Sequence, residues 1–483
     1  MAKSLKQKTV SGLMWSFIDN VSKQGLTFVI GIILARLLSP DEFGLIGMIT
    51  IFIAVSTSVV DSGFSQALIR KKDCTDTDYS TVFYFNLLAG IFLTTILFFA
   101  APLISRFFEE PQLNKLVKVV SVVLVIDALS LIQRTKLIKR VDFKLQTKVS
   151  VIATALGGAL GIALAVAGFG VWSLVAKQIG QRLISAILLW FWNKWKPLWV
   201  FSKKSFKELF GFGSKLLVSG LLNTIYRNIY LLVIGKYFSA SQLGYFTRAE
   251  QFKKLPAENM MRVIQRVTYP VLSDIQDDIP RLIDNYRKLI KSTMFITFIL
   301  MLGMAAAAKP MILTLIGEKW LPSVIFLQLL CLEGMFYPLS ALNLNMLKVQ
   351  GYSHVILKLE VFKKILAVPV IIIGIIYGIN ILIIGMVIHA AIAYYLNGFY
   401  SGKMLNYSIK DQLLDILPSF LLASAMGLVV LVLGNVLHMI PVLKFIIQVL
   451  SAIVFIIGIG ELTKFKDYLF VKDIIIQKLN YKK

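Results

Sequence analysis

The chain of 483 residues is poor in the residues from which disulfides and metal sites are built. It has only two cysteines and three histidines. Cys74 falls in a predicted loop and Cys331 in a predicted membrane span, so the sequence supports neither a disulfide framework nor a metal centre. The histidines, at positions 354, 389 and 438, show no metal-ligand spacing. We therefore expect no metal site.

Recognisable catalytic motifs are absent as well. The sequence has no P-loop (GxxxxGK followed by Ser or Thr), no HExxH and no CxxC pair. The predicted outer loops are too short for an extracellular catalytic domain, and no paired acidic motif stands out. These absences argue against an integral-membrane glycosyltransferase or polymerase. We predict that the protein is not an enzyme and binds no cofactor.

Long apolar runs, in contrast, recur along the whole chain. Hydrophobic residues make up 57% of the sequence and charged residues only 16%. Many runs exceed the ~18 residues that mark a transmembrane helix. The sequence therefore predicts an all-α polytopic membrane protein with about 14 transmembrane helices. We expect them at residues 10–38, 43–69, 79–104, 113–138, 148–169, 171–193, 207–238, 243–270, 284–308, 322–347, 354–377, 379–402, 412–437 and 440–463.

The surplus of basic residues is explained by their positions. Acidic residues number 26 against 51 Lys and Arg, and the net charge is +25. Such a charge would suit nucleic acid, but the basic residues collect in alternate loops, as the positive-inside rule describes. The obvious clusters, on the side of the N-terminus, occur at residues 70–72, 134–148, 194–207, 358–364 and 464–483. Both termini are thus predicted to be cytoplasmic, with the N-terminus retained rather than cleaved, and no nucleic-acid partner is expected.

An internal repeat occurs at an offset of 200 residues. ARLLSPDEFG (35–44) aligns with GKYFSASQLG (235–244), and each segment joins one long span to the next. Six spans between the copies place both in the same orientation, as in transporters with parallel repeats. We predict an N-lobe of spans 1–6 (1–200), a C-lobe of spans 7–12 (201–403), two extra helices (404–463) and a cytoplasmic basic tail (464–483). The tail is equally compatible with a membrane-surface segment and an ordinary polar terminus.

A stripe of charged residues runs along the eighth predicted span. Lys254, Glu258, Arg262 and Arg266 are spaced four residues apart, and Arg248 lies near the outer end of the same span. Charges inside a span are costly and usually face a protein-lined or water-filled cavity. The alternative for Arg262 and Arg266 is that they snorkel or lie in the cytosol. We predict that the four basic residues line a cavity.

Further polar residues mark three other spans. Asp19 and Lys23 are four apart in the first span and can form an ion pair. Asn223 and Arg227 share a face of the seventh span, the repeat equivalent of the first, and Arg182 lies in the sixth. We add Lys23, Asn223, Arg227 and Arg182 to the predicted cavity lining. Asp19, like Glu258 in the stripe, is a candidate either for cation coupling or for a structural ion pair.

Three segments resemble a known family. KQKTVSGLMWSFIDNVSKQGLTFVIGIILARLLSPDEFGLIGM (6–48), DSGFSQALIRKKD (61–73) and YFTRAEQFKKLPAENMMRVIQRVTYPVLSDIQ (245–276) resemble bacterial polysaccharide-export flippases of the Wzx/WzxC type. These belong to the multidrug/oligosaccharidyl-lipid/polysaccharide exporter superfamily. The resemblance implies two six-helix lobes around a central cavity, two further helices, and alternating access in the bacterial inner membrane.

The implied cargo is an undecaprenyl-diphosphate-linked oligosaccharide, moved from the cytoplasmic to the outer leaflet for surface polysaccharide assembly. Basic side chains suit a diphosphate, because Arg offers planar multidentate contacts and Lys a point charge. Membrane lipids and other polysaccharide-assembly proteins are candidate partners, and Na⁺ or H⁺ is a candidate coupling cation. The alternative is a cation-coupled exporter of small drugs. Such a pump would favour an acidic or aromatic cavity, and the surplus of Lys and Arg within the spans argues against it.

Overall fold

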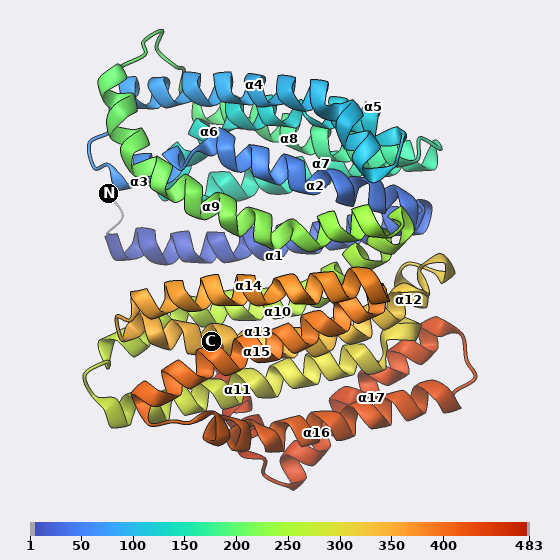
Figure 1. The fold of residues 1–483 in the computed structure, drawn as a ribbon. Helices are drawn as coiled ribbons and strands as arrows, with labels where there is room; N and C mark the ends of the chain where they lie inside the picture. Colours follow the sequence, from blue (N-terminus) through green and yellow to red (C-terminus); the bar gives the residue numbers. More distant parts are fainter. Residues whose placement is uncertain (1–4, 481–483) are drawn as a thin grey trace. The chain divides into compact units, whose positions relative to one another are not determined.

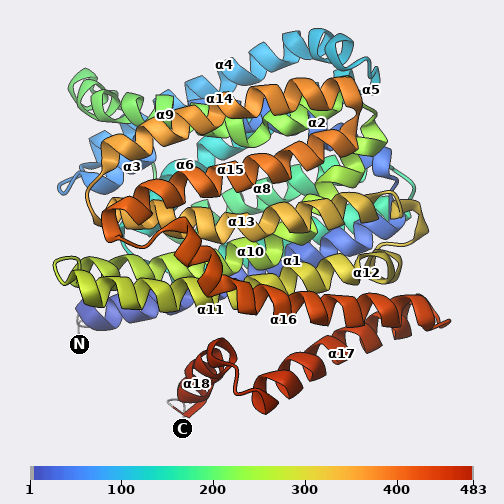
Figure 2. The same cartoon turned by 60° about the horizontal axis from the view of Figure 1, so that its bottom comes forward.

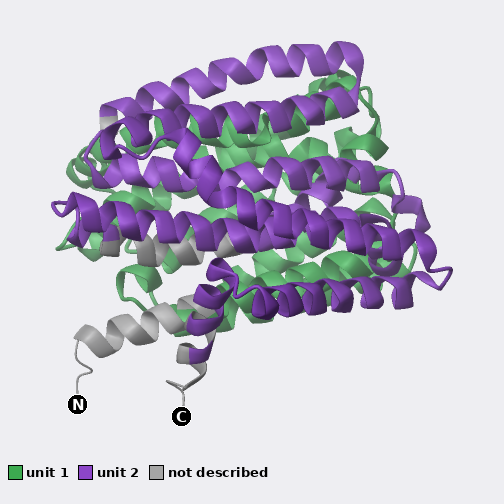
Figure 3. Ribbon diagram, turned by 90° about the horizontal axis from the view of Figure 1, so that it is seen from below, with its two compact units in different colours: residues 1–244 green, residues 245–483 purple. Residues whose placement is uncertain are grey.

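The computed structural model describes residues 5–480 and all their side chains except those of residues 5–14, 16, 17, 258–271, 353, 474, 475 and 477–480. Within these residues the regular structure is helical and no strand occurs, which confirms the all-α prediction (Figure 1). The chain divides into two compact units, residues 1–244 and 245–483 (Figure 3).

The first unit contains nine complete helices and the first residues of a tenth. They are α1 (Leu5–Leu37), α2 (Pro40–Asp61), α3 (Phe64–Arg70), α4 (Asp76–Phe108), α5 (Gln112–Val120), α6 (Val123–Lys139), α7 (Phe143–Val166), α8 (Val171–Asn193), α9 (Lys203–Tyr237) and the start of α10 (Ala240–Asp274). In this unit α7 packs against both α1 and α8, and α9 packs against α2 and α3.

The second unit holds the rest of α10 and eight further α-helices. They are α11 (Ile279–Ala306), α12 (Ala308–Leu315), α13 (Ser323–Val349), α14 (Ser353–Tyr377), α15 (Ile379–Leu405), α16 (Ile409–Val436), α17 (Pro441–Leu462) and α18 (Lys466–Asn480), with a 3₁₀ turn at Glu318–Trp320. Figure 2 shows α17 folding back along α16, and the two helices pack together. The main contacts of α13 are with α15 and α11.

Each of the 14 predicted spans coincides with a helix or with two consecutive helices. Twelve segments among the described residues are long and apolar enough to cross a membrane, so the count of 14 is not established. The two predicted spans outside the twelve are the charged helix α10 and α14, whose first half carries Lys358, Glu360, Lys363 and Lys364. The lobe boundaries at 200 and 403 stay predictions.

Two predicted spans, 43–69 and 113–138, each fall on two consecutive helices instead of one. The break in the first of them has a clear physical cause. Residues 62 and 63 separate α2 from α3, with backbone φ angles of 47° at Ser62 and 72° at Gly63. A Cβ atom at Gly63 would lie 2.4 Å from the carbonyl oxygen of Gly213 in α9. Only glycine meets both the left-handed conformation and this close approach. The turn thus lets α9 pack directly on the α2–α3 junction.

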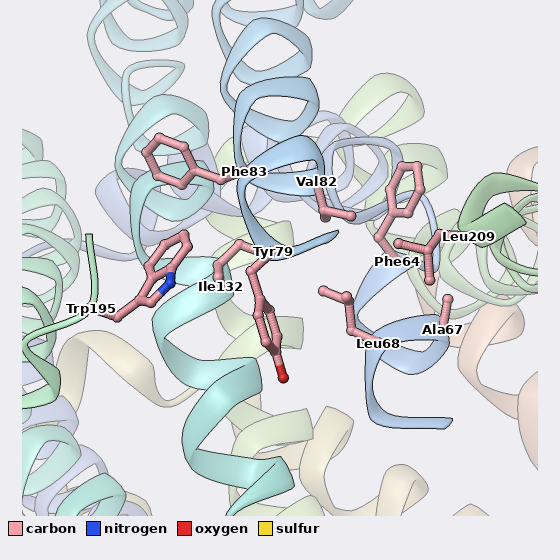
Figure 4. Packing of buried hydrophobic residues seen from close by; sticks show 9 residues of the cluster. All are labelled: Phe64, Ala67, Leu68, Tyr79, Val82, Phe83, Ile132, Trp195 and Leu209. Atoms are coloured by element: carbon pink, nitrogen blue, oxygen red, sulfur yellow. The ribbon is translucent and has the colours of Figure 1, made fainter. Parts of the chain in front are cut away.

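The core at this end of the first unit is aromatic (Figure 4). Its buried members are Phe64, Ala67, Leu68, Tyr79, Val82, Phe83, Ile132, Trp195 and Leu209. Lys136 of α6 lies 4.4 Å from the Tyr79 ring centroid and 4.9 Å from that of Trp195, and it pairs with Asp76 at 3.1 Å. The cluster joins α3, α4, α6 and α9 to the segment that follows α8, since Trp195 also donates a hydrogen bond to Asp76.

A stripe of small residues in α7 faces α8. Ala153, Gly157 and Gly161 are buried in α7. A Cβ atom on Gly157 would approach Gln181 of α8 to 2.7 Å, and one on Gly161 would approach Lys177 to the same distance. These small residues allow α7 and α8 to lie close together.

The internal repeat has matching local structure in its two copies. Ser39 caps the N-terminus of α2, with Glu42 completing a capping box. At the start of α10, the Ser239 hydroxyl accepts from the Gln242 amide at 3.2 Å, and the Gln242 side chain accepts from the Ser239 amide at 3.3 Å. Each copy thus ends one long helix and starts the next with the same reciprocal cap.

The two copies also contact each other within the first unit. A Cβ atom on Gly44 would lie 1.9 Å from the carbonyl oxygen of Ala240, and one on Gly244 would lie 2.0 Å from that of Pro40. Pro40 and Ala240 are themselves equivalent at the offset of 200. The contact is therefore reciprocal, as expected where equivalent parts of a repeat meet about an approximate two-fold axis.

Candidate functional site

A charged cluster lies within the predicted spans of the first unit. Its centre is an ion pair between Arg182 of α8 and Asp127 of α6. Arg182 stands 11 residues from either end of α8 (Val171–Asn193), which is about 16 Å at 1.5 Å per residue. If α8 crosses the bilayer, the pair lies near its midplane. The Asp127 side chain is 6% exposed and that of Arg182 is 34% exposed.

Two more cations surround this pair. Arg134 lies two helical turns after Asp127 on α6. It donates a hydrogen bond to the Ser185 hydroxyl of α8 at 3.1 Å. Lys23 of α1 interacts electrostatically with both Arg134 and Arg182, as well as with Asp19 on its own helix. Three helices thus bring Lys23, Arg134 and Arg182 together. With two carboxylates against three cations, one positive charge is left unbalanced.

The exposure of these cations indicates what they face. Lys23 and Arg134 are exposed and Arg182 is half-buried, although all three lie in candidate membrane spans. Charged groups in spans are directed to protein or to water-filled paths rather than to lipid. We infer that the free sides of the three cations face a hydrated surface. Such a surface can hold an anion through charge-assisted hydrogen bonds.

Asp19 is fixed by a neighbouring helix. It accepts a hydrogen bond from the Ser150 hydroxyl of α7. Lys23 attracts Asp19 electrostatically, but the pair is not among the ion pairs within 4.0 Å in the described part of the chain. The assignment of Asp19 to coupling or to a structural pair stays a prediction.

A second set of charges lies on α10 within the second unit. Lys254 pairs with Glu250 one turn earlier at 2.7 Å, and 46% of its side chain is exposed. Lys253 is buried and pairs with Glu333 of α13. Arg248 is half-buried and donates to Gln251 at 2.6 Å. Among the described cations of α10, Lys254 is the most exposed and can meet a ligand.

The remaining predicted residues fall into two groups. Asn223 and Arg227 are both exposed and lie one turn apart on α9, and between them the Thr224 hydroxyl pairs with Ser58 of α2 at 3.1 Å. The predictions for Glu258, Arg262 and Arg266 lie outside the described residues. Asn223, Arg227, Arg262 and Arg266 remain predicted cavity residues, and Glu258 remains a candidate for cation coupling or for a structural ion pair.

Sequence reasoning did not select Arg134, Asp127 or Glu333. Arg134 was assigned to a basic loop cluster, but it belongs to α6 (Val123–Lys139). Its seven-residue spacing from Asp127 places both on one face of the helix, and this signal could have revealed them. Glu333 carries no comparable signal, because its partner Lys253 is 80 residues away. No group of three or more His, Cys, Asp or Glu that could hold a metal occurs among the searched, described residues.

Comparison with known proteins places the chain in a family. A family model described as "Polysaccharide biosynthesis protein" matches residues 33–325, which is more than half of the chain. The chain belongs to the polysaccharide biosynthesis protein family. This confirms the resemblance inferred from the sequence motifs.

Relatives with 26–27% identity match most of the chain. The lipopolysaccharide biosynthesis protein WzxC of Escherichia coli (strain K12) is 27% identical over 377 residues, 77% of this chain and 76% of the relative. The teichuronic acid biosynthesis protein TuaB of Bacillus subtilis (strain 168) is 26% identical over 72% of each chain. The succinoglycan biosynthesis transport protein ExoT of Rhizobium meliloti (strain 1021) is 27% identical over 70% of this chain and 69% of the relative.

Solved structures show which fold the chain shares. The lipid II flippase MurJ, in an inward closed conformation, matches with a TM-score of 0.74 and 16% identity over 97% of this chain and 99% of that chain. An inward-facing multidrug resistance transporter of the MATE family and MOP superfamily matches with a TM-score of 0.62 and 17% identity, over 79% and 94% of the two chains. The protein is a multi-pass membrane protein with this transporter fold.

Proposed function

We propose that this protein moves a lipid-linked oligosaccharide from the cytoplasmic to the outer leaflet of the bacterial inner membrane by alternating access. The proposal rests mainly on the cluster of Lys23, Arg134 and Arg182, which are three partly exposed cations from three helices. The sugar carrier would present a diphosphate, and the cations would bind its oxygens. The lipid tail would stay in the bilayer while the head group crosses.

The family supports this proposal over the alternatives. Relatives are named for the biosynthesis or transport of lipopolysaccharide, teichuronic acid and succinoglycan. A cation-coupled drug exporter would need carboxylates or aromatic rings toward its cargo. In this cluster Asp127 is instead buried against Arg182. The same proposal includes undecaprenyl diphosphate as the lipid carrier of the oligosaccharide. It also places both termini of the chain in the cytoplasm.

The proposal also includes a coupling cation, Na⁺ or H⁺, with Asp19 as the candidate carboxylate. Asp19 lies beside the cation cluster and binds Ser150. A cation arriving at Asp19 would alter the balance of charge around Lys23. Transport rates under imposed Na⁺ or H⁺ gradients, with and without Asp19→Asn, test this part of the proposal.

The direct test is leaflet exchange of a lipid-linked oligosaccharide in reconstituted vesicles. Lys23→Gln removes one cation of the cluster. The double replacement Arg182→Gln with Asp127→Asn removes a second cation together with its carboxylate partner, so that no buried carboxylate is left unpaired. We expect each to slow exchange by about tenfold or more, because a hydrogen bond to a charged group is worth about 1.5–3 kcal/mol.

The matched control is Lys288→Gln, which removes one charge from an exposed pair with Asp284 and should leave the rate unchanged. Wild-type exchange rates in the cluster variants, at equal amounts of folded protein, would reject the assigned site. Absence of any exchange by the wild-type protein, together with drug efflux, would reject the proposed function.

A further inference from the structure

Four consecutive apolar residues are exposed in the connection between α8 and α9 of the first unit. Leu198, Trp199, Val200 and Phe201, here called the LWVF loop, are 46–94% exposed, and Trp199 is the most exposed of the four. The proposed function uses none of these residues. Contiguous exposed apolar side chains mark a surface that meets either a partner protein or a membrane.

The LWVF loop is held in place by the first turns of α4 (Figure 1). The backbone amide of Leu198 donates to the Ser80 hydroxyl at 2.8 Å, and that of Ser202 donates to the Thr81 hydroxyl at 3.0 Å. Between these anchors the chain turns tightly, since the Val200 amide donates to the Leu198 carbonyl oxygen at 2.8 Å. The apolar side chains are therefore displayed by a backbone that is anchored at both ends.

Trp199 extends an apolar face of α4. Its indole stacks on the Tyr84 ring, with centroids 5.9 Å apart and an interplanar angle of 28°. Large apolar side chains continue this side of the helix every three or four residues and are exposed as well: Leu88, Phe92, Ile96, Phe99 and Leu103. Such a stripe on a candidate membrane span faces lipid. The LWVF loop is thus continuous with the lipid-facing surface of the first unit.

The position of Tyr84 along α4 sets the depth of Trp199. The helix has 33 residues, about 50 Å at 1.5 Å per residue. It exceeds a ~30 Å hydrocarbon core by about 10 Å at each end if the crossing is centred. Tyr84 lies eight residues after Asp76, where α4 begins, which is about 12 Å. Trp199 therefore lies near the boundary of the core, the depth that tryptophan prefers because its ring is apolar and its N–H group polar.

Lysines flank the LWVF loop on both sides. Residues 190–207 include no acidic residue and five exposed lysines: Lys194, Lys196, Lys203, Lys204 and Lys207. The next carboxylate along the chain, that of Glu208, pairs with Lys71 at 3.0 Å. The positive charge of the segment is therefore not balanced within it. Lysine side chains near the boundary of the core can extend to the head groups.

We propose that the LWVF loop and its flanking lysines bind anionic phospholipids at the membrane surface. Trp199 enters the bilayer at the level of the head groups, and the lysines contact lipid phosphates. Continuity with the apolar face of α4 and the depth of Tyr84 favour lipid over a partner protein. The unbalanced positive charge favours anionic over zwitterionic head groups. This surface is separate from the cation cluster and independent of the cargo.

The test measures which lipids lie next to Trp199. Full-length protein is reconstituted in vesicles of equal parts phosphatidylglycerol and phosphatidylcholine, and one of the two lipids carries bromine, a fluorescence quencher, in its acyl chains near the head group. The Trp199 signal is the difference between a protein and the same protein with Trp199→Phe, which keeps a ring at this exposed position. We expect both brominated lipids to quench this signal. Phosphatidylglycerol should be enriched around it at least fivefold, the equivalent of ~1 kcal/mol for one basic residue near an anionic surface.

Two pairs of lysines supply matched variants. Lys203→Gln with Lys204→Gln removes two charges next to the LWVF loop and should lower the enrichment at least twofold while quenching persists. Lys464→Gln with Lys466→Gln is the control, because it removes two exposed lysines from the basic segment after α17 and should leave the enrichment unchanged. All the replaced side chains are exposed, and equal size-exclusion profiles verify folding.

Three results would overturn the proposal. A Trp199 signal that neither brominated lipid quenches would keep the LWVF loop out of the bilayer and leave it to a partner protein. Equal quenching by the two lipids would remove the preference for anionic head groups. An equal loss of enrichment in both lysine pairs would assign the preference to the net charge of the protein and not to this loop.

Discussion

The reciprocal contact between the two copies of the repeat gives the sharpest prediction. Replacing Gly44 by alanine places a Cβ atom 1.9 Å from the carbonyl oxygen of Ala240, whereas real Cβ atoms essentially never come closer than 3.0 Å to another heavy atom. Both groups that collide belong to helix backbones, so no side-chain rotation relieves the clash. The starts of α2 and α10 must therefore separate by about 1 Å.

Forced separation of packed helices typically costs about 1–3 kcal/mol. For a unit of this size the midpoint of thermal unfolding should fall by roughly 3–10 °C. Gly244→Ala should have a similar effect, because its Cβ would lie 2.0 Å from the Pro40 carbonyl oxygen. The double variant should lose less than the sum of the single losses, since one separation relieves both clashes.

The assay heats purified protein in detergent and measures the fraction that still elutes as a single species. Gly220→Ala is the matched control: this helical glycine of α9 has no heavy atom within 4 Å of the added Cβ. Alanine there should raise stability slightly, because it is the better helix former by about 1 kcal/mol. If Gly44→Ala melts at the same temperature as Gly220→Ala, the close contact between the repeat copies is wrong.

Three further predictions concern other parts of the first unit. Asp127→Asn removes the charged partner of the half-buried Arg182 and should destabilise the protein by about 1.5–3 kcal/mol; recovery of thermal stability by a second change, Arg182→Gln, would establish the pairing, and a stable single variant would contradict it. Phe64→Ala should cost about 3–5 kcal/mol because the ring is fully buried, whereas Phe99→Ala, at a 73% exposed ring, should change the melting temperature little. A hydrogen bond from Lys236 lowers the pKa of Glu109, so its small stabilising effect should be present above the ordinary value of about 4.3 and lost as the pH falls through the lower, folded-state pKa. The stability difference between wild type and Glu109→Gln should accordingly disappear in acid, and a constant difference from pH 7 to pH 3 would rule out the ion pair as its cause.

The sequence by itself determined where the helices lie. A chain in lipid must satisfy its backbone hydrogen bonds within each segment and must present about 20 apolar residues per crossing. Both requirements are local, so hydropathy located every predicted span on a helix. The internal repeat could also be recognised from the sequence. Ser39 and Ser239 lie in helix caps whose hydrogen bonds join residues only three positions apart, so the pattern is local. The turn at Gly63 was not predicted, since its cause is the approach of Gly213 from a distant helix.

Only the tertiary structure decided which charges meet. Lys253 and Lys254 are neighbours in sequence, yet Lys254 pairs one turn away with Glu250 and Lys253 pairs across helices with Glu333. The first pair follows from the helical repeat alone. The second, like the meeting of Arg182 with Asp127, depends on how helices cross and which faces they turn to each other. That geometry is set by packing along whole helices, and a sequence pattern within one segment does not contain it.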